Sequence, residues 1–125
     1  MTAGLSVAQY IPMAGNLLHW ALYLETRSET MIYQIVGSVG AFKYKHRGNV
    51  YPQKSSRFIA LVFVSEIDSK DIKAVKSILE SHPINTDVAT SRNCQDWILE
   101  ALEALHDEEY IDVSNFKERV FRNYN

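Results

Sequence analysis

The chain has 125 residues, of which 46% are hydrophobic and 22% are charged, and its formal net charge is -2. These values are ordinary for a soluble globular domain, and a chain of this length buries enough surface to fold without a metal ion or a disulfide. Because 13 basic residues stand against 15 acidic ones, charge gives no drive toward nucleic acid or an anionic membrane. We therefore expect a single domain over residues 1–125 that binds no nucleic acid.

The cysteine count and the hydropathy indicate the cellular compartment in which the protein is expected. The single cysteine, Cys94, excludes an internal disulfide and a zinc site built from several thiolates. A lone thiol suits a reducing compartment. The N-terminal sequence lacks the basic segment and long apolar core of a signal peptide, and no apolar run reaches the roughly 20 residues of a membrane helix. We expect a cytoplasmic protein with no membrane span, no cofactor and no metal.

The first part of the chain predicts a β-hairpin after an irregular start. Residues 1–16 are mixed and rich in small side chains, so we expect an irregular lead-in there. Residues 17–26, LLHWALYLET, carry enough apolar and aromatic side chains for a strand that is buried on both faces. Residues 27–29 predict a turn, and residues 30–39, TMIYQIVGSV, are rich in the β-branched and aromatic side chains typical of a strand.

A loop, a strand and a helix are predicted next. Residues 42–56 are polar and basic and contain Gly48 and Pro52, which favours a loop with room for a short strand at its start. Residues 57–67, RFIALVFVSEI, give the clearest strand pattern of the chain. Over residues 68–84 the apolar side chains recur at helical spacing, which predicts a helix.

The last third is predicted to be helical after a loop over residues 85–92. Residues 93–111 place apolar side chains on one side and acidic ones on the other, as in an amphipathic helix, and Asn93 or Ser91 can cap its start. Residues 112–125 predict a second, short helix. Strands followed by helices indicate an α+β fold in which an antiparallel sheet packs against helices.

Cys94 lies in the first turn of the helix predicted over residues 93–111. The free N–H groups and the positive dipole end of a helix N-terminus lower a thiol pKa, so we expect a reactive thiolate here. A carbonyl group bound at the same place would meet backbone N–H donors, which can form an oxyanion hole. The alternative is that Cys94 only fills space in the core, as lone cysteines usually do.

A reactive cysteine needs a general base, which is most often a histidine. Three of the four histidines are poor candidates, because they are expected in a solvated loop, at a helix end, or about 18 Å along the cysteine's own helix: His46, His82 and His106. His19 remains. It opens a predicted strand against which the helix of Cys94 can pack, and Trp20 and Tyr23 follow it.

Two motifs carry a family resemblance: HWALYL, which begins at His19, and NCQDW, which begins at Asn93. Together they resemble circularly permuted members of the NlpC/P60 (papain-like) superfamily, in particular the lecithin:retinol acyltransferase-like group. They are also similar to motifs of small fungal proteins, some of them associated with natural-product pathways. In ordinary papain-like enzymes the cysteine precedes the histidine, whereas here the order is permuted. The resemblance implies a permuted papain-like core with Cys94 as nucleophile, His19 as base and Trp97 packing the nucleophile's helix.

One position departs from the pattern of that family. The family places a third polar residue, often another histidine, on the strand after the first histidine, where it orients the imidazole. The strand over residues 30–39 offers Gln34, with Tyr33 and Glu29 as lesser candidates. An amide can orient the ring of His19 but stabilises an imidazolium less than a carboxylate does. Catalysis is therefore expected to be weak, differently arranged or lost.

Three hypotheses for the function follow. The first is a cysteine-dependent hydrolase or acyltransferase that acts on an amide, ester or thioester with Cys94, His19 and Gln34 as catalytic residues. The second is a retired or repurposed papain-like protein that binds a small molecule, or is a non-covalent cyclase in natural-product biosynthesis. The third is an interaction module with an acidic helix face, for which a solvated face is the simpler interpretation.

The small-molecule, acyl or peptide substrate of the first two hypotheses is expected to contact aromatic and polar residues near the two motifs. These are Asn93, Trp20, Tyr23 and Trp97. Basic side chains of the 42–56 loop can supply further contacts, although a solvated surface loop is the simpler interpretation. They are Lys43, Lys45, His46, Arg47 and Lys54.

Overall fold

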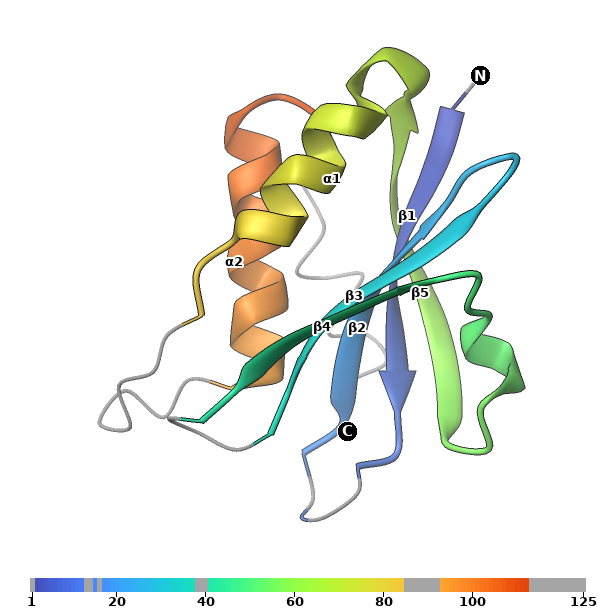
Figure 1. Cartoon of the computed structure of the whole chain (residues 1–125), viewed down its shortest axis with the longest axis vertical. Coiled ribbons are helices and arrows are strands. Elements are labelled where there is room, and N and C mark those ends of the chain that lie inside the picture. The colour runs from blue at the N-terminus through green and yellow to red at the C-terminus, as the bar shows by residue number, and fades with distance from the viewer. Residues whose placement is uncertain (1, 13–14, 16, 38–40, 85–92, 113–125) are drawn as a thin grey trace.

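The protein folds as an α+β domain in which a five-stranded antiparallel sheet carries two helices on one face (Figure 1). The computed structural model describes residues 2–12, 15, 17–37, 41–84 and 93–112, and the statements below concern these residues. The strands are β1 (Thr2–Tyr10), β2 (His19–Glu25), β3 (Thr30–Val36), β4 (Lys43–Gly48) and β5 (Phe58–Asp68). The helices are α1 (Ile72–Ser81) and α2 (Cys94–Asp107), with short 3-10 turns η1 (Pro52–Lys54) and η2 (Ser69–Asp71).

The strand order is β4-β3-β2-β1-β5, and each neighbouring pair is antiparallel. The first four strands follow one another as a meander. The chain then passes through η1 from the β4 edge to the opposite edge, where β5 pairs with β1. This connection lies across the sheet face that the helices do not cover.

Alternation along β2 explains how both faces of the sheet are buried. Trp20, Leu22 and Leu24 belong to the main core, which α1 and α2 complete from one side of the sheet. Ala21 and Tyr23 point the other way, into a smaller cluster. A strand buried on both faces has a nearly continuous apolar sequence, as the prediction for residues 17–26 required.

The smaller cluster forms where the β4–β5 connection returns over the sheet. Val50 packs against Ile32, Ala21 and Tyr23. The connection is fixed in place by Thr30, whose Oγ1 donates to the carbonyl of Val50 at 2.8 Å and whose own carbonyl accepts from the Asn49 N–H at 2.8 Å. The second face of the sheet therefore has a partial cover with space beneath it.

The prediction of an irregular lead-in over residues 1–16 is wrong, because Thr2–Tyr10 forms strand β1 in the interior of the sheet. Ala3, Leu5 and Val7 alternate into the main core. The small side chains between them gave a weak strand signal, although small residues suit a strand that is covered on both sides. Pairing with both β2 and β5 then supplies the order that local propensity does not.

The other elements lie within a few residues of their predicted ranges. The strand at the start of the 42–56 loop is β4, and the helices expected over 68–84 and 93–111 are α1 and α2. The short helix predicted over 112–125 lies, apart from its first residue, outside the described residues. In the described part of the chain, neither helix has the length and apolar character needed to cross a bilayer.

Candidate functional site

The candidate site begins at the N-terminus of α2, where a complete capping box fixes Cys94 as the first helical residue. The side chain of Asn93 accepts from the backbone N–H groups of Gln95 and Asp96 at 2.9 and 3.2 Å. The carboxylate of Asp96 accepts in turn from the Asn93 N–H at 3.0 Å. This reciprocal pattern satisfies N–H groups that a helix start otherwise leaves free. Of the two caps that the sequence left open, Asn93 is therefore the one that the structure has.

The start of α2 contacts β2 where that strand has lost its β3 partner. The β2–β3 ladder runs only from Leu22 to Glu25 on the β2 side, so His19 pairs with β1 alone. The carbonyl of Leu18 accepts from Gln95 Nε2 at 2.9 Å and from the Cys94 thiol at 3.9 Å. Hydrogen bonds thus hold Cys94 and Gln95 against the backbone of Leu18, the residue immediately before His19.

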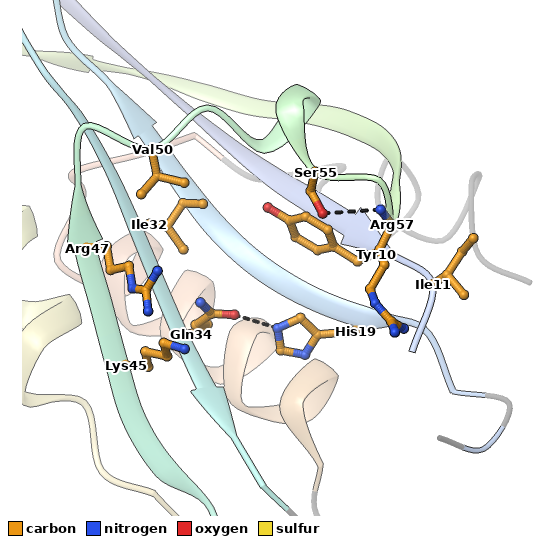
Figure 2. Close-up of a pocket in the computed structure, with 10 residues that line it drawn as sticks. All are labelled: Tyr10, Ile11, His19, Ile32, Gln34, Lys45, Arg47, Val50, Ser55 and Arg57. Carbon is orange, nitrogen blue, oxygen red and sulfur yellow. Dashed lines mark hydrogen bonds between the residues drawn. The ribbon is translucent and has the colours of Figure 1, made fainter. Parts of the chain in front are cut away.

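The imidazole of His19 is oriented by Gln34, as the sequence predicted. Nε2 of His19 and Oε1 of Gln34 are 2.5 Å apart (Figure 2). An amide oxygen only accepts, so Nε2 carries the proton and Nδ1 is left with a lone pair. The ring is therefore held in the tautomer that a general base at Nδ1 requires.

His19 stands in the wall of two cavities. The first, which we call the thiol cavity, has a volume of about 330 Å³. Its lining includes Cys94, Asn93, His19, Leu17, Ile35 and Phe42. The second, which we call the basic cavity, has a volume of about 350 Å³ and lies under the β4–β5 connection. Its lining includes Tyr10, His19, Gln34, Lys45, Arg47 and Arg57. Cys94 and His19 border one space, although no hydrogen bond joins these two described side chains.

Comparison with known proteins places the chain in a family. Residues 5–112 match the model of DUF6540, whose description is a family of unknown function. The chain belongs to the DUF6540 family. No curated protein and no solved structure gives a significant match. Because the family description assigns no activity, the chemistry of this DUF6540 domain has to be argued from the geometry of the site.

Burial controls the acidity of the thiol. It raises the pKa of Cys94 above the ordinary value for a thiol, and the charge of Asp96 acts in the same direction. The backbone N–H groups of Trp20, Gln95 and Cys94 lower that pKa, but by less. The N–H groups at the helix start do lower the pKa of Cys94, as predicted. The prediction that its pKa would be lowered overall is wrong, because burial raises it by more. Cys94 rests as a neutral thiol at neutral pH.

Burial also keeps the histidine neutral. It lowers the pKa of His19 below the ordinary value, and the positive charge of Lys45 lowers it further. The hydrogen bond to Gln34 raises the pKa of His19, but burial lowers it by more. Cys94 and His19, which both border the thiol cavity, are therefore neutral at neutral pH, and they do not form a thiolate–imidazolium pair.

The lowered pKa of His19 predicts how stability depends on pH. The unfolded chain binds a proton at an ordinary histidine pKa of about 6.5, and the folded chain binds it only at lower pH. The free energy of unfolding should therefore fall as the pH is lowered from about 7 to about 5. Urea denaturation at several pH values checks this.

His19→Gln should reduce that pH slope, and part should remain because burial also lowers the pKa of His82. Above about pH 7.5 both histidines are neutral in the folded and unfolded states, so wild type and His19→Gln should there have the same slope. An unchanged slope for His19→Gln between about pH 7 and about pH 5 would contradict the burial of a neutral His19.

The remaining histidines lie away from the thiol, as expected from the sequence. His46 is exposed on β4, the short strand expected at the start of the 42–56 loop. His82 forms the C-cap of α1 with its ring against Trp97, and burial lowers its pKa. His106 lies near the far end of α2, where Nδ1 is 3.4 Å from the carbonyl oxygen of Ile111.

Three of the four residues expected to contact substrate are core residues instead. Trp20 and Trp97 are fully buried or nearly so in the main core, with Trp97 packed edge-on against Tyr44. Tyr23 is buried in the smaller cluster on the other face. None of the three lines the thiol cavity or the basic cavity. Of the four residues, Asn93 alone lines the thiol cavity. The three aromatic residues near the motifs therefore stabilise the fold.

Sequence reasoning named only part of the basic cavity. Lys45 and Arg47 were considered as substrate contacts, with a solvated surface loop as the simpler interpretation, and Tyr10 and Arg57 were not singled out. These residues come from β1, β4 and the start of β5, which approach one another only after the connection crosses the sheet. The described residues contain no group of three or more histidine, cysteine, aspartate or glutamate side chains placed to bind a metal ion.

Proposed function

We propose that this DUF6540 protein is a thiol-dependent acyl-transfer enzyme, with Cys94 as nucleophile and His19 as general base. The observation that carries the proposal is that both residues border the thiol cavity while Gln34 holds the imidazole in one tautomer. A cysteine at a helix start, a base within the same cavity and a third group that orients the base form the arrangement expected of an activated nucleophile.

The proposed reaction uses Cys94 and His19, the two side chains that border the thiol cavity together. Nδ1 of His19 takes the thiol proton as the sulfur attacks the carbonyl carbon of an ester, thioester or amide. The carbonyl oxygen becomes an oxyanion near the backbone N–H of Cys94, which supplies a hydrogen bond. The bond to the leaving group then breaks, and the imidazolium returns its proton to that group. Water or a second nucleophile releases the acyl group from the sulfur and restores the thiol.

The architecture supports a permuted papain-like core as part of the proposal. The histidine lies at the start of a sheet strand, β2, and the cysteine follows it in the chain at the start of the helix that packs on that sheet. The connection between them runs through three further strands and α1. This is the chain order implied by the resemblance of HWALYL and NCQDW to the permuted group.

One observation favours a second candidate, a binding protein that uses the same cavities without a covalent step. Cys94 is only 7% exposed, and burial raises the pKa of its thiol. A buried neutral thiol reacts slowly unless a base assists it. The two candidates therefore differ in whether His19 transfers a proton, and this difference can be measured.

Acylation of Cys94 by a small neutral ester tests the proposal. After incubation with p-nitrophenyl acetate, mass spectrometry of wild type should show an acetyl group on the peptide that contains Cys94. The acetyl group should be removed by hydroxylamine at neutral pH, because it is held as a thioester. Cys94→Ala should retain only hydroxylamine-resistant acetylation of lysines. Absence of a thioester in wild type would count against acyl transfer and favour the binding protein.

A further inference from the structure

The basic cavity gathers positive charge without an acidic partner. Figure 2 shows Lys45 and Arg47 on one side of the cavity and Arg57 on the other, with Gln34 and His19 between them. Among the described residues, no carboxylate lines this space. Within the described residues, none of these three cations forms an ion pair. Since the whole chain has a formal net charge of -2, this concentration of cations does not reflect the overall composition.

The cations surround an apolar surface. Ile32, Val50 and Ile11 also line the cavity, together with the ring of Tyr10. Cations on a convex surface are separated by water, whereas these converge from opposite sides on one space of about 350 Å³. That volume is at the lower end of the range for small-molecule sites, in which a few polar groups fix an apolar ligand.

Two interactions involve the cations that line the basic cavity. Arg57 Nη1 donates to the carbonyl of Pro12 at 3.0 Å, and the Arg57 N–H donates to Ser55 Oγ at 3.2 Å. These bonds fix Arg57 at the end of the crossing connection. From the other side, the positive charge of Lys45 lowers the pKa of the His19 imidazole, although burial lowers it more. The field of the basic cavity therefore reaches the wall that it shares with the thiol cavity.

We propose that the basic cavity binds the anionic group of the substrate, a carboxylate or a phosphate attached to an apolar body. Building on the proposed acyl transfer, this assigns the substrate as an amphipathic anion that is anchored by Arg57, Lys45 and Arg47. Its reactive carbonyl lies past His19 in the thiol cavity. Arginine favours such groups because its planar donors match carboxylate and phosphate oxygens.

Equilibrium binding of a matched set of small probes tests the assignment. The set is 3-phenylpropanoate, phenyl phosphate, inorganic phosphate and the neutral 3-phenylpropanol, each titrated into the full chain by calorimetry. At least one of the two phenyl anions should bind about tenfold or more tightly than the alcohol, with an affinity that falls as salt is added. Comparing the two phenyl anions separates a carboxylate from a phosphate site. Inorganic phosphate should bind more weakly than the better phenyl anion, because it lacks the apolar body.

Charge-removing variants locate the site. Arg57→Gln, Arg47→Gln and Lys45→Gln should each weaken binding of the better anion by about tenfold. Lys43→Gln is the matched control. Lys43 lies two residues before Lys45 on the same face of strand β4, but it does not line the cavity. This substitution should change the affinity by less than about twofold. Circular dichroism and thermal melting confirm that each variant is folded.

A titration of the His19 imidazole by NMR adds a local measurement. Bound anion should move the titration midpoint of His19 upward, because negative charge favours the imidazolium. Equal binding of the anions and the alcohol, or equal effects of Lys43→Gln and the three cavity variants, would overturn the assignment. Acylation by neutral p-nitrophenyl acetate does not depend on an anionic anchor. If the Cys94 thioester forms but no anion binds, the proposed anion site is wrong and the proposed acyl transfer stands. If an anion binds but no thioester forms, the anion site stands and the proposed acyl transfer is wrong.

Discussion

Replacing His19 with alanine is expected to slow acylation of Cys94 at neutral pH by about a hundredfold to ten-thousandfold, the usual contribution of a positioned general base. The thiol rests protonated because burial raises its pKa, and burial keeps His19 neutral and able to accept a proton. Without the imidazole, only the small thiolate fraction present at equilibrium can attack. Release of p-nitrophenolate under single-turnover conditions measures the rate.

Two further variants control this prediction. His46→Ala removes an exposed imidazole on β4 that lines neither cavity, and its rate should match wild type. Gln34→Leu should lower the rate less than His19→Ala does, because Gln34 positions the ring without touching the reacting atoms. It should also move the acid limb of the pH–rate profile to lower pH, since the Gln34 hydrogen bond raises the pKa of His19. A rate for His19→Ala equal to wild type would rule out proton transfer by this histidine.

Replacing Trp20 with alanine is expected to destabilise the fold by about 3–5 kcal/mol, the usual cost of truncating a buried tryptophan. Its side chain is completely buried in the main core beneath the helices. A loss of this size is a large fraction of a stability of about 5–15 kcal/mol, so the urea midpoint of the variant should fall well below that of wild type. Urea denaturation followed by far-ultraviolet circular dichroism measures the change.

Trp20→Phe and Tyr51→Ala show what part of that loss is due to burial. Phenylalanine retains most of the apolar volume at position 20 and should recover much of the stability. Tyr51 is 49% exposed, so its truncation should change the stability by less than about 1 kcal/mol. If Trp20→Ala kept its stability and lost binding instead, Trp20 would be a substrate contact, as its place beside His19 in the sequence had indicated.

The fold could be predicted where the hydrophobic period is strong. The alternating and continuous apolar patterns of β2, β3 and β5, and the helical spacing in α1 and α2, gave the α+β class and most boundaries. Strand β1 was missed because the interior position that orders it depends on pairing with β2 and β5. The small residues of Thr2–Tyr10 carry little strand propensity of their own.

The grouping of residues in the candidate site was predictable, whereas its electrostatics were not. Cys94, His19 and Gln34 follow from the two motifs and the intervening strand, and the structure brings the histidine to the glutamine and to the cavity of the cysteine. The direction of the thiol pKa depends on burial, which a sequence does not give. The basic cavity depends on the path of the β4–β5 connection, so Lys45 and Arg57 could not be recognised as neighbours beforehand.

The contacts of Leu18 with Cys94 and Gln95 join positions separated by 76 and 77 residues. Closing so long a stretch of chain costs entropy that only the packed sheet and helices can offset. We therefore expect the thiol cavity to form late in folding, after the meander and the β5 pairing have brought the two ends of that stretch together. The proposed acylation of Cys94 with the help of His19 should accordingly require the completed native state, whereas unfolding would expose an ordinary thiol.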